Sequence, residues 1–385
     1  MKEDFNKLRL KYHGDPTMMD EILQRECRYK TASKLAETLR CENFRFPSLA
    51  VAEMSTSDAV AEIHAEMIAD GATVLDMTCG LGIDSFHFAR KAESVTCIEL
   101  DNHACSTARH NVSALELNNV IVIEGDSIAF INDCNKSFDY IFVDPARRDS
   151  AGRHFDLGDC SPDIVPALDT ILSKCRRALI IKASPMIDIK SAVGELAHDC
   201  EIVTIGTAKE CKEVVFKIQS DFQRKPNPSI TRISALTVNQ SGFEISPDEE
   251  STASTLPATL SVGGFLLEPY PAVMKSGGMK LLSSRFGVGK LHPNTHLYTC
   301  ESPLPTGFPG EAFEIVEIIE FSKKSIKDIS KRYPTINVAT RNFPLSPPQL
   351  SAKLKTKDGG ENMLFGATIA DGSKLLIVTK MGQPL

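Results

Sequence analysis

The sequence lacks the features that would place the protein in a membrane or a secretory pathway. Its longest apolar runs, such as 95–98 and 178–183, fall far short of the roughly 18 residues that a membrane-spanning helix needs. The first fifteen residues are charged throughout and contain no apolar core of the kind that a signal peptide has. We therefore expect a cytoplasmic protein with no membrane partner.

Cysteine spacing disfavours a zinc centre or a disulfide framework. The chain has 11 cysteines, an odd number, and no two of them are spaced as CxxC. Several, including Cys97, lie within apolar runs typical of strands, so reduced thiols are expected. His292 and His296 have the i, i+4 spacing of a helical zinc site, but Pro293 stands between them and no acidic partner follows. We predict no metal.

Charge is distributed unevenly along the 385 residues, a length that suggests two to three domains. The net charge is −7, yet residues 1–224 hold 26 Lys and Arg against 36 Asp and Glu. The last 65 residues hold 11 basic against 4 acidic side chains. A local basic surface can bind a polyanion even where the whole chain is acidic.

The middle of the chain alternates short apolar strands with helices, which predicts an α/β fold with a parallel sheet. Seven strands are expected, at 73–77, 94–99, 119–124, 138–144, 177–183, 201–206 and 211–219. The last two are joined by four residues, too few for a parallel crossover, so they form an antiparallel hairpin. The prediction is a Rossmann-like seven-stranded sheet with an antiparallel last strand.

The flanking regions differ from this pattern. Residues 1–54 read as helical, whereas 230–305 are rich in strands and 311–385 read as a compact α+β module. One helix is predicted through 272–286, and an exposed loop over 244–255. A helix at 163–175 is predicted between the fourth and fifth strands.

A glycine-rich turn follows the first strand. Asp76 ends that strand, and Gly80 and Gly82 allow a tight turn and a close approach of a ligand to the backbone. Ser85 stands where a dinucleotide fingerprint requires a third glycine. The Asp76 carboxylate would repel a pyrophosphate but suits a cationic ligand, so an NAD-dependent oxidoreductase is disfavoured.

Acidic residues also end the next two strands. Glu99 is placed to accept both hydroxyls of a ribose, and Asp126 can accept from the exocyclic amine of adenine. Taken singly, Asp76 could be a strand-end cap, Glu99 a solvated loop charge and Asp126 the N-cap of the next helix. Together at one sheet edge they describe a ligand with a ribose, an adenine and a positive charge, namely S-adenosylmethionine.

These motifs resemble those of a known family. DMTCGLGID (76–84), IELD (98–101), EGDS (124–127) and the seven-strand pattern resemble class I S-adenosylmethionine-dependent methyltransferases, and the glycine motif resembles bacterial rRNA guanine-N2 methyltransferases. The whole chain is similar to bacterial RNA methyltransferases with a helical N-terminal domain, a ferredoxin-like domain and a THUMP-like C-terminal domain. The stretches that carry this likeness are 55–61, 143–148, 181–189, 209–214, 267–277, 290–299 and 341–350.

The resemblance implies domains at 1–54, 55–222, 230–305 and 311–385. It also implies S-adenosylmethionine as cofactor and RNA, either rRNA or tRNA, as partner. The residues expected to bind the cofactor follow the first three strands: Asp76, Thr78, Gly80, Gly82, Glu99, Asp126 and Ser127. Thr78 stands where many relatives have glycine, which tightens the loop.

The turn after the fourth strand, Asp144-Pro-Ala-Arg147, is the expected catalytic site, with Asp144, Pro145 and Arg147 in it. In class I enzymes that methylate nitrogen, the first residue of a related turn accepts a hydrogen bond from the target amine. Here Ala146 replaces a second proline, and Arg147 replaces an aromatic residue that would stack on a base. A guanidinium can also stack on a base or bind phosphate.

Further basic and polar side chains are expected to bind the substrate: Arg148, Arg153, Lys182, Ser184, Lys323, Lys327 and Arg341. Arg147 and Arg148 could instead pair with Asp149 or Asp156 and pin the loop, and the lysines of 323–332 could form an ordinary solvated helix face. His64, His87 and His110 are interpreted as surface or packing residues, and Cys79 as a packing residue.

The leading hypothesis is a methyltransferase that acts on a base in structured RNA. A methyltransferase for a protein or a small molecule, and a cofactor-binding assembly factor without turnover, remain alternatives.

Overall fold

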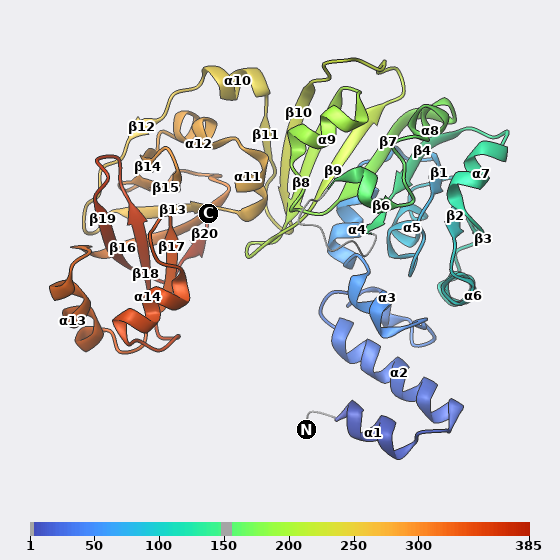
Figure 1. The fold of residues 1–385 in the computed structure, drawn as a ribbon, viewed down its shortest axis with the longest axis horizontal. Helices are drawn as coiled ribbons and strands as arrows, with labels where there is room; N and C mark the ends of the chain where they lie inside the picture. The colour runs from blue at the N-terminus through green and yellow to red at the C-terminus, as the bar shows by residue number, and fades with distance from the viewer. Residues whose placement is uncertain (1–3, 148–155) are drawn as a thin grey trace. The chain divides into compact units, whose positions relative to one another are not determined.

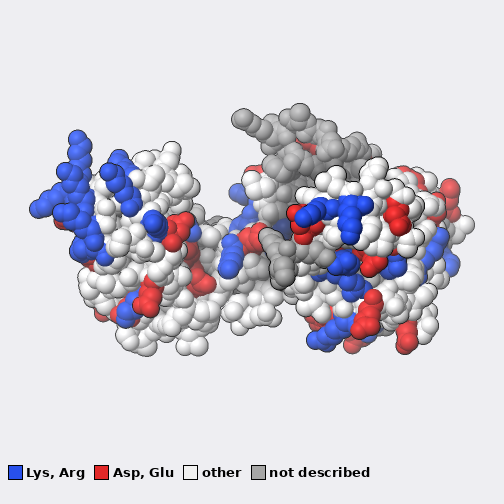
Figure 2. All heavy atoms as spheres, turned by 90° about the horizontal axis from the view of Figure 1, so that it is seen from below, with Lys and Arg blue, Asp and Glu red and all other residues white. Residues whose placement is uncertain are grey.

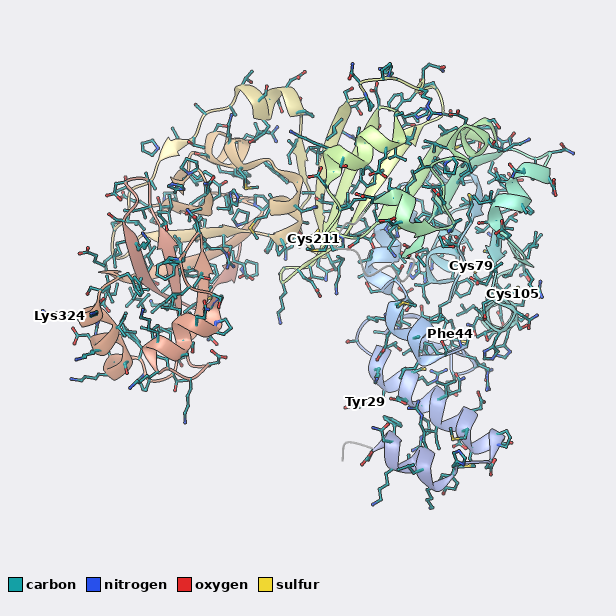
Figure 3. All side chains as sticks on the ribbon, in the orientation of Figure 1. Tyr29, Phe44, Cys79, Cys105, Cys211 and Lys324 are labelled. Carbon is teal, nitrogen blue, oxygen red and sulfur yellow. The ribbon has the colours of Figure 1, made fainter. Side chains whose placement is uncertain are left out.

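The N-terminal segment is helical, as predicted. It contains α1 (Phe5–Lys11), α2 (Pro16–Thr31), the short 3-10 helix η1 (Thr38–Arg40) and α3 (Leu49–Met54). Asp15 is the N-cap of α2, because its carboxylate accepts hydrogen bonds from two free amides in the first turn of the helix. Phe44, labelled in Figure 3, packs edge-on against Phe86, with ring centroids 6.4 Å apart. The helical segment therefore shares its core with the residues that follow the glycine turn.

The computed structural model describes residues 4–147 and 156–385. Nine strands form one sheet: β1 (Thr73–Asp76), β2 (Ser94–Glu99), β3 (Val120–Glu124), β4 (Phe138–Val143), β7 (Cys175–Ala183), β8 (Cys200–Gly206), β9 (Cys211–Gln219), β10 (Ile230–Thr237) and β11 (Phe243–Ile245). Their order is β11-β10-β8-β9-β7-β4-β1-β2-β3 (Figure 1). β7, β4, β1, β2 and β3 are parallel, and β9 pairs antiparallel with β7. The seven predicted strands and the α/β class are confirmed.

Six helices connect or flank these strands: α4 (Asp58–Ala65), α5 (Ile83–Phe88), α6 (Asn102–Ala114), α7 (Ser127–Asp133), α8 (Leu168–Ser173) and α9 (Ile189–Leu196). Ser57 caps α4, because its hydroxyl accepts from the amide of Val60 at 3.4 Å. Asp101 caps α6 in the same way. Both caps place the start of a helix immediately after the turn that precedes it.

The connection between β4 and β7 differs from the prediction. The expected helix over 163–175 is reduced to α8, since Pro166 disfavours helical backbone at Val165 and β7 already begins at Cys175. Ahead of α8 lie β5 (Ala146–Arg147), η2 (Leu157–Asp159) and β6 (Cys160–Ser161), and β5 and β6 pair antiparallel. The Asp144 turn therefore runs directly into a small ribbon.

The chain divides into two compact units, and the division passes through β8 and the turn after it. The first unit comprises Met1–Ile202 and Glu213–Ile230, and the second Val203–Lys212 and Thr231–Leu385. The predicted cofactor and acceptor residues lie in the first unit.

The second unit is built on another large sheet. Its strands are β12 (Leu256–Pro257), β13 (Phe265–Pro269), β14 (Gly289–His292), β15 (Thr295–Cys300), β16 (Gly310–Glu320), β17 (Asn337–Arg341), β18 (Asn362–Thr368), β19 (Lys374–Lys380) and β20 (Gln383–Pro384). They follow the order β12-β14-β15-β13-β16-β19-β18-β17, with β20 against β16. Helices α13 (Lys323–Arg332) and α14 (Pro347–Leu354) pack Ile329 and Leu350 on the sheet, in agreement with the α+β module predicted for 311–385.

Two predictions for the second unit were wrong. The single helix over 272–286 is two helices, α11 (Pro271–Ser276) and α12 (Met279–Phe286), because Gly277 ends the first with a φ of +87°. The exposed loop over 244–255 contains the end of β11 and helix α10 (Pro247–Thr252), which begins with a proline and three acidic residues. Over the described residues, helices are either too short or too polar to cross a membrane.

Candidate functional site

Five predicted site residues come from the same edge of the first sheet. β7, β4, β1, β2 and β3 run in parallel, so their carboxyl ends lie together. Asp76 and Glu99 end β1 and β2, Lys182 is the last residue but one of β7, and Asp144 and Asp126 follow β4 and β3. The sheet therefore brings the cofactor-side and acceptor-side candidates to one edge.

The glycine turn has the geometry that its sequence requires. Gly80 and Gly82 have φ values of +56° and +89°, which side-chain-bearing residues rarely adopt. A Cβ on Gly82 would lie 2.4 Å from the ring of Phe86, so this position also has no room for a side chain. Cys79, labelled in Figure 3, is buried just before Gly80 and packs against the core, as predicted.

Glu99 is oriented by the backbone of two loops. Its Oε2 accepts from the amide of Gly80 at 2.7 Å, and its Oε1 accepts from the amide of Asp101 at 2.8 Å. A carboxylate oxygen has two lone pairs, so each oxygen still has capacity for a ligand hydroxyl. The Glu99 side chain thus ties the glycine turn to β2 while it faces the sheet edge.

Asp76 is buried beneath the glycine turn. It accepts hydrogen bonds from the Ser85 hydroxyl at 2.6 Å and from the Thr78 amide at 2.9 Å. Burial raises the pKa of Asp76 to about 7, although both hydrogen bonds oppose the shift. The Thr78 hydroxyl in turn accepts from the amide of Asp144 at 2.7 Å, which joins the glycine turn to the turn after β4.

Asp126 and Ser127 lie where β3 leads into α7. Asp126 is exposed and caps α7, with its Oδ1 accepting from the amide of Ala129 at 2.8 Å. Ser127 is buried as the first residue of the helix. The capping role foreseen for Asp126 is therefore present, and its exposed side chain also lies at the predicted sheet edge.

The acceptor turn is only partly described. The Asp144 side chain is 39% exposed, Pro145 is buried, and the backbone of Arg147 pairs with Cys160 in the small ribbon. Arg148 and Arg153 lie outside the described residues. The described backbone before and after these two arginines is joined by the pairing of β5 with β6.

Lys182 is half-buried within the first unit, whereas Ser184 is exposed. The Lys182 ammonium donates to Asp144 Oδ2 at 2.7 Å and to the Thr56 hydroxyl at 3.0 Å, and lies 3.5 Å from Glu213 Oε2. Burial alone would lower the pKa of Lys182, but the charges of Asp144 and Glu213 outweigh it and raise that pKa. The ammonium therefore stays charged beside Asp144.

A buried histidine that the sequence prediction did not connect with the site lies behind Lys182. His64 is fully buried, its Nδ1 is 2.7 Å from Asp84 Oδ1, and its Nε2 contacts Glu213. Burial opposes the charged form, but the two carboxylates raise the pKa of His64 to about 10. The charges of His64 and Lys182 likewise overcome burial and lower the pKa of Asp84 to about 2.

Thr56 completes this arrangement. Its hydroxyl donates to Asp84 Oδ2 at 2.6 Å and accepts from Lys182. The five side chains form a closed ring, which we call the ionic ring: Thr56, His64, Asp84, Lys182 and Glu213. Four of them, all except His64, lie in sequence stretches that carry the family resemblance, and this was the signal in the sequence that could have found them.

The basic residues predicted for the second unit have different environments. Lys323 and Lys327 are exposed on α13, whereas Arg341 forms an ion pair with Glu268. Figure 2 shows Lys and Arg side chains gathered at the left, where α13 lies in Figure 1, and Figure 3 labels Lys324 on that helix. Of these three predicted residues, the two lysines belong to this exposed group.

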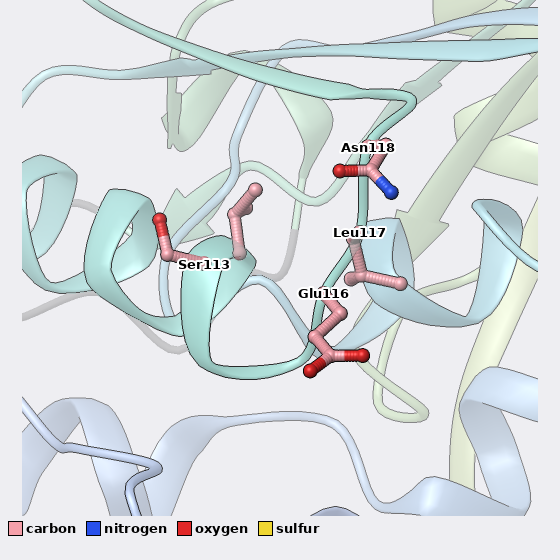
Figure 4. Close-up of a pocket in the computed structure, with 5 residues that line it drawn as sticks. Ser113, Glu116, Leu117 and Asn118 are labelled. Carbon is pink, nitrogen blue, oxygen red and sulfur yellow. The ribbon is translucent and has the colours of Figure 1, made fainter.

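A surface hollow lies away from the predicted site. Val112, Ser113, Glu116, Leu117 and Asn118 line it at the end of α6 (Figure 4). α6 begins at the edge that holds Glu99 and returns along the sheet, so its last turn lies at the opposite edge. This hollow contains none of the predicted site residues.

His64→Gln tests the ionic ring. The change removes the buried cation that lies between Asp84 and Glu213, and we expect the free energy of unfolding to fall by about 3–5 kcal/mol, measured by urea denaturation at pH 7. The control is His110→Gln, at an exposed position, which we expect to change stability by less than about 0.5 kcal/mol.

The effect should depend on pH in a defined direction. The folded pKa of His64 is raised, so its stabilising contribution is complete below about pH 6.5 and is lost as pH rises through about 10. The difference in the free energy of unfolding between wild type and His64→Gln should therefore become smaller from pH 7 to pH 10. A difference that stayed constant over this range would contradict a charged His64.

Three family models match the chain. Residues 54–152 match the family described as conserved hypothetical protein 95, residues 265–309 match a ferredoxin-like domain, and residues 310–381 match a THUMP-like domain. The first match covers the glycine turn, Glu99 and Asp144. The other two matches lie in the second unit.

Similar proteins cover most or part of the chain. An uncharacterized S-adenosylmethionine-dependent methyltransferase of Mycobacterium tuberculosis is 25% identical over 86% of this chain and 87% of its own length. The ribosomal RNA large subunit methyltransferase K/L of a Shewanella species is 31% identical over 41% of this chain, which corresponds to 22% of that protein.

A solved structure matches nearly the whole chain. The crystal structure of a "putative methyltransferase" from Porphyromonas gingivalis W83 is 31% identical, with a TM-score of 0.84, and the match covers 98% of this chain and 94% of that one. The strand order, the glycine turn and the carboxylates at the sheet edge agree with this likeness. The chain therefore belongs to the class I methyltransferases with ferredoxin-like and THUMP-like domains, enzymes whose methyl donor is S-adenosylmethionine.

Proposed function

We propose that this methyltransferase modifies a base in structured RNA, either rRNA or tRNA, at a nitrogen atom. The observation that carries the proposal is Asp144, a partly exposed carboxylate that is held by Lys182 at the sheet edge beside the cofactor turn. A carboxylate in this place accepts a hydrogen bond from an N–H group. The exposed lysines of α13 supply a surface for the polyanion that carries the base.

The residues of the sheet edge fit the cofactor. Glu99, held by two backbone amides, presents its oxygens to the two ribose hydroxyls, and Asp126 is exposed where the adenine amine would lie. The positive φ values of Gly80 and Gly82 let the turn approach a ligand closely. S-adenosylmethionine supplies an electrophilic methyl group on a positively charged sulfur. Carboxylates suit such a cation better than they suit a phosphate-bearing ligand.

Asp144 would act on the other reactant. Its carboxylate accepts from the N–H of the target amine and turns the nitrogen lone pair toward the methyl carbon. S-adenosylmethionine would supply the methyl group, its sulfur keeping the electron pair of the broken carbon–sulfur bond as the carbon–nitrogen bond forms, and Asp144 would receive the surplus N–H proton and pass it to water. Such a displacement depends mainly on positioning, so a strong general base is not required.

RNA as the substrate is supported by two observations. The Shewanella relative is a ribosomal RNA methyltransferase by name, although the shared region is a small part of it. In addition, Lys323, Lys324, Lys327 and Lys331 are exposed and form no ion pair with any residue of 4–147 or 156–385. Such lysines can neutralise phosphates.

Mass spectrometry of rRNA and tRNA nucleosides from a strain that lacks the gene tests the proposal. We expect one methylated nucleoside to disappear and to return when the wild-type gene is restored. Unchanged nucleosides would contradict RNA methylation and would favour a protein or small-molecule acceptor.

Glu99→Ala should weaken cofactor binding. A charge-assisted hydrogen bond contributes about 1.5–3 kcal/mol, so we expect S-adenosylmethionine affinity, measured by calorimetry, to fall roughly ten- to a hundredfold. Glu124→Ala is a matched control, because Glu124 has the same register on the neighbouring strand β3. Unchanged affinity in Glu99→Ala would mean either that Asp101 makes the ribose contact or that the proposed cofactor site is wrong.

Asp144→Ala should separate binding from transfer. We expect cofactor affinity within about twofold of wild type and no detectable methyl transfer, because Asp144 follows β4 and faces the acceptor. Radiolabelled transfer to total RNA from the deletion strain measures the second effect, and Asp144→Asn, which keeps one acceptor oxygen, should retain a residual rate. If Asp144→Ala lost cofactor affinity as fully as Glu99→Ala, the two sides of the site would be wrongly assigned.

Charge reversal on α13 tests the proposed RNA surface. The double variant Lys323→Glu, Lys327→Glu should weaken binding of the same RNA. It should also make the slope of log affinity against log salt concentration shallower, by about 0.7 for each phosphate that the helix no longer neutralises. Cofactor affinity should not change. The control Lys209→Glu with Lys280→Glu makes the same charge change away from α13, and equal effects of the two double variants would contradict a specific role for this helix.

A further inference from the structure

The Lys182 ammonium is surrounded by partners from its own chain. Asp144, Thr56 and Glu213 lie 2.7, 3.0 and 3.5 Å from Nζ, and the side chain is only 12% exposed. An ammonium group has three donors and no acceptor. With three partners already in place, Lys182 is poorly available to an RNA phosphate.

The partners of Lys182 are themselves fixed by the ionic ring. Glu213 is held by His64, His64 by Asp84, and Asp84 by the Thr56 hydroxyl, which returns to Lys182. These residues come from α4, α5, β7, β9 and the residue before the α4 cap. A ring closed across so many elements leaves the Lys182 side chain little freedom to move.

Asp144 is the one carboxylate bound to Lys182 that extends out of the ring. Its Oδ2 accepts from Lys182, and its amide is bound to the Thr78 hydroxyl. Within 4–147 and 156–385, Oδ1 has no hydrogen-bond donor, and the side chain is 39% exposed. One oxygen is therefore anchored, and the other is left for an incoming N–H group.

We propose that Lys182 is a positioning residue, which the ionic ring holds so that Asp144 presents a single oxygen to the methyl acceptor. This proposal deepens the proposed function and rests on it. It also narrows the acceptor class to groups that donate a hydrogen bond, such as an amino or ring N–H, because a charged carboxylate oxygen can only accept.

Lys182→Met tests the proposal. The control is Lys91→Met, which also removes a partly buried lysine in an ion pair, here with Glu66, but at the other end of β1. The substrate is total RNA from the deletion strain. We expect the transfer rate at saturating cofactor and RNA to fall roughly ten- to a hundredfold. The RNA KM, its salt dependence and the cofactor affinity should stay within about twofold of wild type. A raised KM with an unchanged rate would instead mean direct contact with RNA and would overturn the proposal.

Thr56→Val provides a second variant if Lys182→Met does not fold. It keeps the shape of the side chain, removes both ring hydrogen bonds of Thr56 and leaves every charge in place, and we expect a several-fold lower rate. Wild-type rates in both variants would overturn the proposal.

A readout independent of RNA separates this proposal from the proposed function. In a crystal structure of Lys182→Met or Thr56→Val, we expect the Asp144 carboxylate to leave its wild-type position. If wild-type enzyme methylated no RNA but Asp144 moved in the variant, the RNA assignment would fail and the positioning role would stand. An unmoved Asp144 would overturn the positioning role even if RNA were methylated.

Discussion

Charge buried beside the sheet edge must be matched by charge of the opposite sign, and this constraint organises the site. Three carboxylates, Asp84, Glu213 and Asp144, surround the two cations His64 and Lys182. Removing one partner from such a set leaves an uncompensated charge, which costs far more than the intact set contributes. The arrangement therefore favours one geometry over alternatives in which a side chain turns away.

The same constraint connects the two reactants. Asp84 lies in the first turn of α5, after the glycine turn, and Asp144 begins the turn that we propose holds the acceptor. The ionic ring, through Lys182, therefore joins the helix after the proposed cofactor turn to the proposed acceptor carboxylate. One shorter link runs directly between the two sides, from the Asp144 amide to the Thr78 hydroxyl, while the Gly80 amide fixes Glu99 within the proposed cofactor side. Cofactor and acceptor would therefore meet on a surface whose parts are fixed before either binds, which is what a displacement reaction requires.

The sequence predicts the parts of the site that depend on local order. Apolar strands ending in Asp76 and Glu99, glycines at 80 and 82 and the hairpin after β8 all follow from spacing and turn length. The ionic ring does not, because Glu213 contacts a histidine 149 residues away, and helical periodicity indicates only which face His64 occupies. Likewise, Gly277 could be read as a tolerated helix residue, whereas its positive φ ends α11.

A crystal structure of the protein with S-adenosylhomocysteine tests the account most directly, because it places cofactor and acceptor sides in one measurement. We predict that the ribose hydroxyls bind Glu99 and that the sulfur faces Asp144, whose Oδ2 remains on Lys182. A nucleoside bound away from Glu99, or a sulfur directed away from Asp144, would contradict the assignment of this sheet edge as the site of methyl transfer.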